Sequence, residues 1–474
     1  MRKLGIILAA VLLAGLLPGS PALAAPGPQL YTVVFTSEAL PEDAAALVEA
    51  AGGEVVLTIP EIGVLQARAG GGFVGRMLAT PGVQTAGPAI PVTLDIPAVQ
   101  VAGEAEDVDL GGADLYELYQ WDIKRVTDDG ASFALGTGHH GVVVGVIDTG
   151  IFPHPDLAAN LLGGRNFIPA GGWGDDPSET GDPADYLDRH GHGTHCAGTI
   201  AANGRVLGVG PDLGLRAYRV LTREGSGSTA WIAAGMVQAT KDGCRVLSLS
   251  LGGFAVMGQV FWTDPETGAT YRLGNSVAGF LAYQRAVRFA VENGTVVVAA
   301  AGNDGLNCAN KHLCTEYLNE LYGHLGYRFV GATFTVPAWM PGVICVSATG
   351  PDDSLASYSN YGPGYIDLAA PGGDFQRWPE PGWWYDMCLN TYALVLPDGT
   401  PFVGYAWMAG TSMACPKTSG VAALVASTHP ELGAQQIAEI VMQTAEDIGR
   451  VGVDPYFGHG MVNAYRSLSL VPQG

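Results

Sequence analysis

Three histidines and a cysteine crowd into one short stretch of the chain. The segment RHGHGTHCAG, residues 189–198, holds His190, His192, His195 and Cys196. Imidazole and thiolate groups are zinc ligands, but a zinc site needs ligands that converge in space. The same cluster could instead present a single catalytic base, with the other side chains only supporting it. These two interpretations describe different hydrolases, and the remaining polar motifs decide between them.

Two further polar residues stand at the ends of apolar segments. Asp148 ends GVVVGVID, which is typical of a buried parallel strand, and Ser412 begins a long apolar helix in AGTSMACPKTSGVAALVAS. A hydroxyl is a weak nucleophile unless a base takes its proton, and that base needs a carboxylate to fix its tautomer. Acid, base and nucleophile stand in the chain order Asp148, His192, Ser412. A metal site would leave Asp148 and Ser412 unexplained, so we interpret His192 as a base.

The elements that must position these residues alternate along the chain. Apolar, nearly uncharged segments predict buried strands: GVVVGVID, LRAYRVL, CRVLSLSLGG, GTVVVAAAGN and GVICVSAT. Segments with helical spacing lie between them: THCAGTIAAN, STAWIAAGMVQATKDG and FLAYQRAVRFAVENG. This alternation predicts an α/β fold in three layers, with a mostly parallel central sheet and helices on both sides. Active groups in such sheets lie at the carboxyl ends of strands, as Asp148 does.

A small α/β unit is expected before this sheet. In residues 29–95 the sequence predicts a strand (LYTVVFT), a helix (PEDAAALVEAAGG), two strands (EVVLTI and GVLQARA), a short helix (GGFVGRMLATPGV) and a final strand (IPVTL). From Pro88 to Leu118 the chain loses periodicity and becomes acidic, which indicates a cleavable linker.

The first residues have the pattern of a secretory signal. Arg2 and Lys3 precede an apolar segment, and Ala22-Leu23-Ala24 supplies a small-residue cleavage site. The apolar segment is shorter than the ~20 residues of a membrane span, and no later stretch is long and apolar enough to cross a membrane. We therefore expect residues 1–24 to be removed and the protein to be secreted, either outside the cell or into a periplasm or cell envelope.

Composition limits the partners of the chain. The 474 residues are 48% hydrophobic and 14% charged, so more than one domain is expected. The net charge of −22 argues against nucleic acid and anionic membranes as partners, since both repel an acidic surface.

The motifs around the three polar residues resemble those of the subtilisin-like serine proteases (subtilases, peptidase family S8). The acid motif is Asp148-Thr149-Gly150-Ile151, the base motif is HGTHCAG from His192, and the nucleophile motif is GTSMACP around Ser412. A fourth match is AAAGN, in which Asn303 corresponds to the side chain of the oxyanion hole. The chain order of acid, base and nucleophile is that of subtilisin itself. The resemblance extends over roughly residues 115–468, with FGHGMVNA near its end.

The resemblance implies a division of the chain and a set of roles. It implies a propeptide at 25–95 that inhibits the enzyme and assists folding, a linker at 96–118 with the processing site, and a catalytic domain at 119–474. His195 becomes a packing neighbour of the base, and His190 a loop residue. No cofactor is required for the chemistry. The implied substrate-binding residues are Ser250, Leu251, Gly252, Ala300, Ala301, Gly302, Gly225, Ser226 and Gly227.

Several alternatives compete with this assignment. Aspartic proteases also carry D-T-G, but they need a second carboxylate motif, and the sequence has no other D-T-G or D-S-G. A G-x-S-x-G esterase does not fit Ser412, where the sequence is Gly-Thr-Ser-Met-Ala. Asn303 precedes Asp-Gly and could simply form a turn, and residues 29–95 could be an independent binding domain.

Seven cysteines leave at least one thiol unpaired or bonded between chains. Cys308 and Cys314, in the loop-like GLNCANKHLCTE, are the expected disulfide. Four others stand among small or apolar neighbours and are expected to be buried: Cys196, Cys244, Cys345 and Cys415. A bond between Cys196 and Cys415 stays open, and the resemblance implies that Cys196 is a buried free thiol that would make the enzyme sensitive to mercurials.

An acidic loop before His190 offers a candidate structural calcium site. Carboxylates so spaced can bind calcium, although a solvated acidic loop explains them equally well; they are Asp175, Asp176, Asp182, Asp185 and Asp188. The segment AANGRVLGVGPD lacks the longer loop that builds the strong calcium site in many subtilases. Aromatic-rich insertions at 254–280, 304–340 and 373–407 either rim the cleft or stabilise the surface.

The sequence thus predicts a secreted, monomeric serine endopeptidase made as a self-processed zymogen. The pocket motifs contain small residues and no evident acid, which resembles members with broad specificity and an apolar preference before the scissile bond. Two other functions stay open: a catalytically silent binding protein of the same shape, and a dedicated processing protease with one physiological substrate. Protein or peptide substrates and its own propeptide are the expected partners.

Overall fold

The computed structural model describes residues 29–104, 114–173, 176–396 and 399–470. Their centre is a seven-stranded sheet in the order β17-β16-β14-β11-β7-β9-β8. Every strand pairing in this sheet is parallel. Its strands are β7 (Val143–Asp148), β8 (Leu161–Asn166), β9 (Gly214–Arg219), β11 (Val246–Leu249), β14 (Val296–Ala300), β16 (Val343–Thr349) and β17 (Leu368–Pro371).

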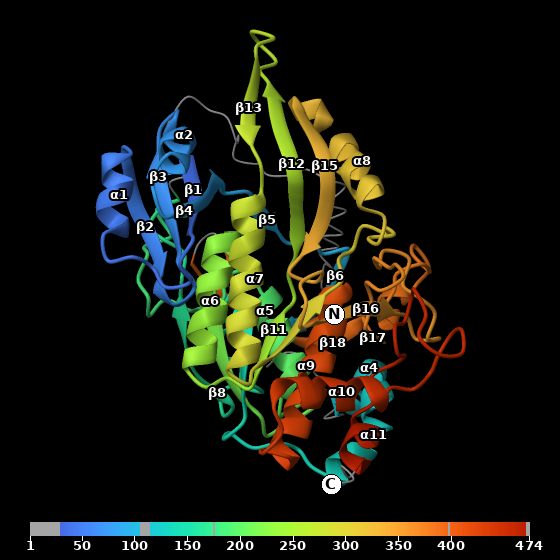
Figure 1. Cartoon of the computed structure of the whole chain (residues 1–474). Helices are drawn as coiled ribbons and strands as arrows, with labels where there is room; N and C mark the ends of the chain where they lie inside the picture. Colours follow the sequence, from blue (N-terminus) through green and yellow to red (C-terminus); the bar gives the residue numbers. More distant parts are fainter. Residues whose placement is uncertain (1–28, 105–113, 174–175, 397–398, 471–474) are drawn as a thin grey trace.

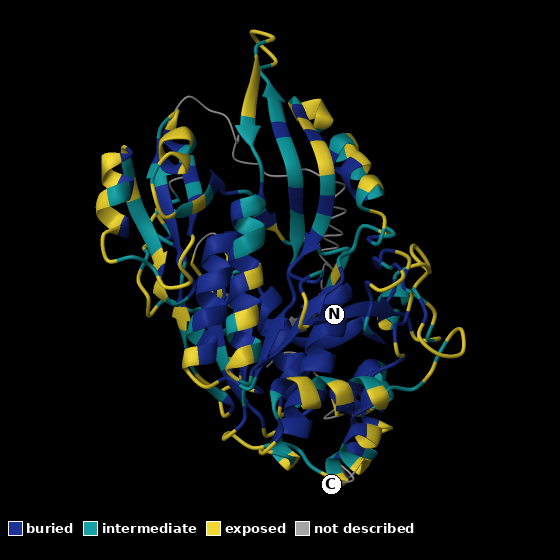
Figure 2. Ribbon diagram, viewed as in Figure 1, coloured by how far each residue is buried: buried dark blue, intermediate teal, exposed yellow. Residues whose placement is uncertain are grey.

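Helices cover both faces of this sheet because its strands are apolar on both faces. Within β14, Val296 and Val298 belong to one hydrophobic core, whereas Val297 and Ala299 belong to the other. The first core packs against α5 (His192–Ala201) and α9 (Thr411–Thr428), and the second against α6 (Thr229–Lys241) and α7 (Val277–Glu292). Figure 1 shows α6 and α7 side by side in front of the sheet, and Figure 2 shows the sheet as the buried centre.

The predicted α/β layers are confirmed, with two strands missed. All five predicted strands form, as β7, β9, β11, β14 and β16, and the three predicted helices are α5, α6 and α7. β8 was missed because Gly163-Gly164 interrupts it, and β17 because its four residues are too short to show a period. The other helices are α3 (Leu115–Tyr119), α4 (Trp121–Thr127), α8 (Lys311–Tyr322), α10 (Ala434–Gln443) and α11 (Ala464–Ser469). Among the described residues, none of the helices combines the length and apolar character needed to cross a bilayer.

The N-terminal unit is an antiparallel four-stranded sheet in the order β2-β3-β1-β4. It contains β1 (Gln29–Phe35), α1 (Ala44–Ala50), β2 (Gly53–Ile59), β3 (Val64–Ala69), α2 (Phe73–Leu78) and β4 (Val83–Pro88). Phe35, Val48, Leu65 and Phe73 lie in its separate core. The sequence prediction missed β4 and placed IPVTL in this sheet instead.

The IPVTL segment leaves the N-terminal unit altogether. Its residues form β5 (Pro91–Thr93), which pairs antiparallel with β10 (Ser226–Ser228) of the larger α/β unit. β6 (Ala98–Glu104) follows and pairs antiparallel with β19 (Pro401–Ala409). IPVTL thus forms the predicted strand with a different partner, and the linker expected at 96–118 supplies one further strand, β6, because β19 far along the chain completes it.

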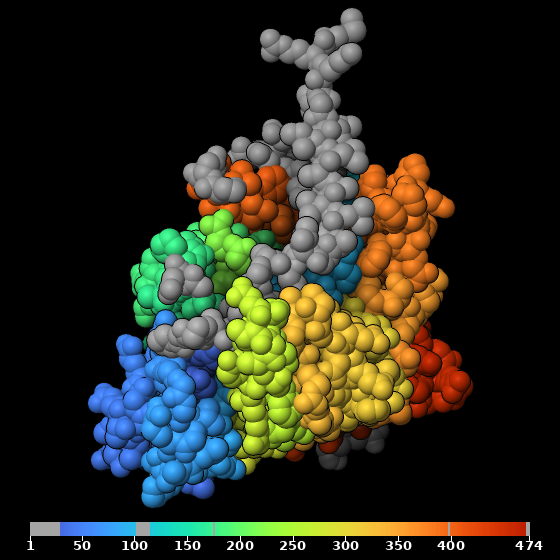
Figure 3. Space-filling view, turned by 90° about the horizontal axis from the view of Figure 1, so that it is seen from above, coloured from blue at the N-terminus to red at the C-terminus, as the bar shows by residue number. Residues whose placement is uncertain are grey.

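The three insertions build two small sheets. Residues 254–280 and 304–340 contribute to the sheet β13-β12-β15, formed by β12 (Gly253–Thr263), β13 (Thr270–Gly274) and β15 (Tyr327–Val336), against which α8 packs. The hairpin of β12 and β13 projects from the top of the molecule in Figure 1, and Figure 3 shows it beside the blue N-terminal unit. Residues 373–407 supply β18 (Cys388–Val395) and most of β19, and these strands form the sheet β18-β19-β6.

Candidate active site

Asp148 and His192 meet at the carboxyl end of β7. The His192 Nδ1 atom lies 2.8 Å from Asp148 Oδ1, and neither side chain is exposed. The backbone N–H of Thr149 also donates to Asp148 Oδ1, at 2.7 Å. A carboxylate held in this way fixes the tautomer of the imidazole, so that His192 Nε2 is free to accept a proton.

The start of α5 is shaped to hold His192 against β7. Asp188 accepts hydrogen bonds from the backbone N–H groups of His190, Gly191 and Thr194, which anchors the first turn of the helix. Gly193 must be glycine, because a Cβ there would lie 2.2 Å from the carbonyl oxygen of Gly150.

Asp148 and Cys196 together raise the pKa of His192. Complete burial is the largest single influence and lowers this pKa, but the Asp148 carboxylate, the Cys196 side chain and the hydrogen bonds to both outweigh it in sum, so that the pKa lies well above its ordinary value of 6.5. The Cys196 sulfur lies 3.9 Å from His192 Nδ1, and burial raises the pKa of this thiol. A buried protonated thiol is a poor nucleophile, so Cys196 lines the site without acting as its nucleophile.

The other two histidines do not share the role of His192. Burial and Lys417 lower the pKa of His195 to about 3, so this ring is neutral. Its Nε2 lies 3.2 Å from the Cys388 carbonyl and 3.1 Å from the Ala406 carbonyl, and therefore carries the hydrogen that it donates to these acceptors. His195 thus fastens the β18–β19 hairpin to α5. The sequence interpretation described it as a packing and hydrogen-bonding neighbour within the helix but not as the link to this hairpin. His190 lies in the loop before α5.

Ser412 stands at the start of α9 with its hydroxyl turned toward a neighbouring loop. Its Oγ donates to the Ser250 carbonyl at 3.0 Å, while Ser250 Oγ donates to the Ser412 carbonyl at 2.8 Å. None of the described residues forms a hydrogen bond with the buried His192 Nε2. Rotation of the Ser412 side chain toward this nitrogen would complete the nucleophile–base pair.

Asn303, just beyond β14, presents an amide donor to the same cleft. Its Oδ1 accepts from the backbone N–H of Thr411 at 2.9 Å and from the Thr411 hydroxyl at 2.8 Å. Since an oxygen must accept those bonds, the orientation of the amide is fixed and Nδ2 is the donor. Nδ2 donates to the carbonyl oxygen of Asp95 at 2.7 Å.

The chain's own residues 91–95 occupy the cleft in the manner of a substrate. Three register pairs align β5 with β10: Thr93 with Ser226, Val92 with Gly227 and Pro91 with Ser228. The N–H of Leu94 donates to the Gly225 carbonyl at 2.9 Å. The predicted residues Gly225, Ser226 and Gly227 thus form the strand along which this segment lies.

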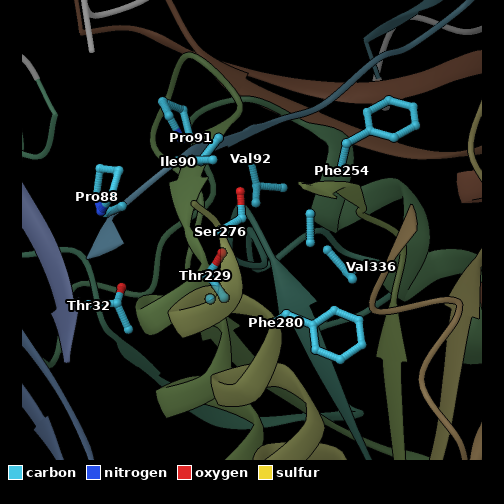
Figure 4. Close-up of a pocket in the computed structure, with 13 residues that line it drawn as sticks. Thr32, Pro88, Ile90, Pro91, Val92, Thr229, Phe254, Ser276, Phe280 and Val336 are labelled. Atoms are coloured by element: carbon cyan, nitrogen blue, oxygen red, sulfur yellow. The ribbon is translucent and has the colours of Figure 1, made fainter. Parts of the chain in front are cut away.

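Val92 is buried and lines a small pocket beside the cleft. Phe254 and Ala255 of β12 and Val336 of β15 line the same pocket (Figure 4). The first two insertions therefore rim the cleft, which was one of the two alternatives for them. Val92, whose side chain lines this pocket, is three residues before Asp95 in the chain.

The surroundings of the Asp95 side chain include an acid that the predicted pocket motifs do not contain. Ala300, Ala301 and Gly302 follow β14 as predicted, with Ser250, Leu251 and Gly252 after β11. The protein around Asp95 and, second, the Asp304 carboxyl raise the pKa of Asp95 to about 6, although the Asp95 residue itself is exposed. The pocket motifs themselves contain no acid, and Asp304 adds a carboxyl group near the Asp95 side chain.

The structure does not bring the candidate calcium ligands together. Asp188 caps α5, Asp185 pairs with Arg189, and Asp176 and Asp182 each accept from a backbone N–H two residues ahead. Asp175 lies outside the described residues. Among the described part of the chain, three or more metal-ligating groups converge only at Asp148, His192 and Cys196, and the first two of these already form the acid–base pair.

All seven cysteines are buried and unbonded in the structure. The expected burial of Cys196, Cys244, Cys345 and Cys415 is confirmed, and none of them forms a disulfide. The Cys308 and Cys314 thiols interact with one another but are not joined, so their disulfide stays a prediction.

Comparison with known proteins agrees with this geometry. The subtilase family pattern matches residues 139–460. Nisin leader peptide-processing serine protease NisP of Lactococcus lactis subsp. lactis is 32% identical over 335 residues, which are 70% of this chain and 47% of NisP. This chain thus spans about half the length of NisP. Subtilisin Savinase of Lederbergia lenta is 35% identical over 347 residues, covering 73% of this chain and 96% of Savinase.

A solved structure extends the similarity beyond the catalytic core. The crystal structure of the epidermin leader peptide processing serine protease EpiP from Staphylococcus aureus has a TM-score of 0.74 at 28% identity. The match covers 94% of this chain and 99% of that one. With the family pattern, these matches establish the membership that the Asp148–His192 pair, Ser412 and Asn303 indicate: the chain belongs to the subtilase family of serine proteases.

Proposed function

We propose that this protein is an exported serine endopeptidase made as a zymogen that cleaves its own chain between Asp95 and Ile96. One observation carries the proposal: the Asp95 carbonyl accepts a hydrogen bond from Asn303 while the preceding residues pair with β10. Such an arrangement presents the Asp95 carbonyl carbon to Ser412. The bond lies at the boundary between the expected propeptide and the expected linker.

The geometry supports the following sequence of steps. Ser412 Oγ attacks the Asp95 carbonyl carbon while His192 takes the hydroxyl proton and Asp148 stabilises the resulting imidazolium. The carbonyl oxygen becomes an anion that the Asn303 amide and the Ser412 backbone N–H stabilise. His192 then protonates the Ile96 nitrogen, which leaves with the C-terminal part of the chain. Water, activated by His192, hydrolyses the ester between Asp95 and Ser412.

The N-terminal unit supports an inhibitory role because it is bound firmly beside the cleft. Gln66 of β3, which is fully buried, donates to the Ser228 hydroxyl at 2.7 Å and accepts from Trp231 Nε1 at 2.8 Å. Arg285 of α7 donates to carbonyl groups of the same unit. A unit held in this way keeps residues 91–95 in the cleft and excludes other substrates.

A processing role is favoured over broad digestion. Asp304 beside the residue before the scissile bond works against a purely apolar preference, and the insertions enclose the cleft on one side. NisP and EpiP are leader-peptide-processing proteases by name, whereas Savinase is a subtilisin. A cleavage profile on a peptide library separates the two roles: a processing protease cuts few sequences, and a digestive one cuts many.

Intact-mass measurement of the secreted chain beside its Ser412→Ala variant tests self-cleavage. We expect the wild type to begin at Ile96 or later and the variant to retain the N-terminal unit. Identical processing of both would show that another protease cuts the chain. Absence of processing in both would favour the silent binding protein. The expected signal at residues 1–24 lies outside the described residues, and the N-terminus of the Ser412→Ala chain tests it.

A further inference from the structure

The chain stays extended and paired after it passes the catalytic residues. Beyond the Asp95–Ile96 bond, Pro97 packs against Gly410, next to the nucleophile, where a Cβ on Gly410 would lie 3.5 Å from Pro97 Cδ. Ala98 then pairs with Ala409, and the antiparallel register continues through Val99 with Met408 and Gln100 with Trp407 to Val101 with Ala406. The register shifts there, and pairing resumes at Gly103 with Tyr405 and Glu104 with Gly404. The segment is held on both sides of the scissile bond, by β10 before it and by β19 after it.

β19 presents this edge as the central strand of the small sheet to which residues 373–407 contribute. In the sheet order β18-β19-β6, the hairpin β18–β19 is covalently continuous, whereas β6 belongs to the segment that enters the cleft. Without β6, one side of β19 has free backbone N–H and carbonyl groups. Such an edge accepts an added strand of any sequence that can extend.

The hairpin is fixed to the helix that carries the catalytic base. His195 Nε2 donates to carbonyl groups of both its strands, at Cys388 and Ala406. Thr391 Oγ1 donates to the Thr194 carbonyl at 2.9 Å, and Gly198 lies so close that a Cβ there would be 2.1 Å from Asn390 Oδ1. The β19 edge is thus preorganised relative to His192, which is a requirement for a binding site that aligns a substrate.

We propose that the free edge of β19 is a substrate-binding site for the residues that follow the scissile bond. Its ligand is an unfolded peptide segment, which β19 binds as an added antiparallel strand from the third residue after the cut. The inference rests on the proposed peptidase function and specifies its substrate class. The substrates are extended chains that continue beyond the scissile bond far enough to pair with β19, rather than short peptides or folded loops. The chain's own residues 98–104 are the first such ligand.

Peptides with the sequence of the chain's own segment test the site. The short peptide is PAIPVTLDIP, residues 88–97 with an amidated end, and the long peptide is PAIPVTLDIPAVQVAGE, residues 88–104. The enzyme is the full chain with residues 98–104 replaced by proline and glycine in alternation, so that after maturation its own segment lacks the backbone N–H groups needed to pair with β19 and does not compete. Several backbone hydrogen bonds should raise kcat/KM for the long peptide by roughly tenfold or more.

Backbone methylation gives a control of matched sequence. Successive N–H groups of a strand point to opposite sides, so only one of two alternating sets faces β19. Long peptides N-methylated at Ala98 and Gln100, or at Val99 and Val101, differ only in that set. One of the two doubly methylated peptides should lose the whole increase in kcat/KM over the short peptide, and the other should keep most of that increase. The peptide IPAVQVAGE, residues 96–104, should also inhibit cleavage of the short peptide.

The outcomes separate the site from the proposed function. Equal kcat/KM for short and long peptides, or equal loss from both methylated pairs, overturns the β19 site while leaving the peptidase intact. Failure to cut any peptide, or equal cutting by a Ser412→Ala preparation, overturns the peptidase function itself. If the freed edge pairs with a second copy, size-exclusion chromatography shows a dimer and the long peptide gains nothing, which also overturns the proposal.

Discussion

Replacing Arg285 with methionine tests how the N-terminal unit is held on the catalytic core. Arg285 is 7% exposed as a residue, and its guanidinium group donates four hydrogen bonds into that unit. The acceptors are the carbonyls of Ile62 (2.8 Å), Phe35 (2.8 Å) and Ser37 (3.2 Å) and the side-chain oxygen of Gln84 (2.7 Å). Methionine keeps most of the apolar stem but removes every donor.

The expected magnitude follows from the burial of these bonds. Hydrogen bonds to a charged group contribute about 1.5–3 kcal/mol each, but they are not additive and water replaces some of them. A net loss of about 3 kcal/mol raises the fraction of undocked units by about 100-fold. Arg288→Met is the matched control. The side chain of Arg288 is 45% exposed and that of its ion-pair partner Glu38 is 62% exposed, and exposed pairs contribute only about 0–1 kcal/mol to stability.

Amide hydrogen exchange measures the effect in the full chain, in the Ser412→Ala background where the unit stays attached. Arg285→Met should accelerate exchange in the segments of residues 29–88 that face α6 and α7, and Arg288→Met should change it by no more than about fivefold. If both variants exchange alike, the buried guanidinium is not the anchor and the reasoning from burial fails.

Three further predictions concern the site. Asn303→Ala should slow self-cleavage by about 10²–10³, the range known for this donor in subtilisin, and a loss below about fivefold in a processing time course would contradict its role. In Ser412→Ala, docking of residues 91–95 in the cleft should weaken as the pH rises from 3.8, the ordinary pKa of an Asp carboxyl, to about 6, the pKa of Asp95 in the docked state. A carboxyl whose pKa is raised on docking favours the docked state while it is protonated. Exchange protection of residues 91–95 across this window checks the sign, and Asp95→Asn should abolish the dependence. Cys196→Ala should keep kcat/KM within about threefold while removing inhibition by mercurials, which peptide hydrolysis with and without the reagent would show.

The alkaline side of the profile depends on the catalytic base. Cleavage needs neutral His192, whose pKa lies well above 6.5 in the occupied cleft. The self-cleavage rate should therefore rise with pH through that pKa, beyond the range in which an unperturbed histidine titrates. A rate that is already constant above pH 6.5 would show that Asp148 does not hold the imidazolium as the geometry indicates.

The sequence by itself determined the chemistry and the layers of the core. Apolar segments such as GVVVGVID leave no polar face for solvent, so they require burial on both faces and hence a covered parallel sheet. Local motifs around Asp148, His192 and Ser412 carry their roles, because each must sit at a strand end or helix start. Gly193 shows why such motifs are strict: a Cβ there would meet the Gly150 carbonyl.

Only the tertiary structure decided what surrounds that chemistry. The segment IPVTL has the pattern of a strand but no local signal for its partner, and β10 lies more than a hundred residues away. Asp304, the neutral His195 and the β19 edge gain their roles from groups brought together across the chain, which a single sequence does not encode by period or spacing. Strand pairing, buried charge and close approach depend on these distant contacts. The same contacts place the chain's own residues 91–95 in the cleft beside a triad that the sequence alone makes recognisable.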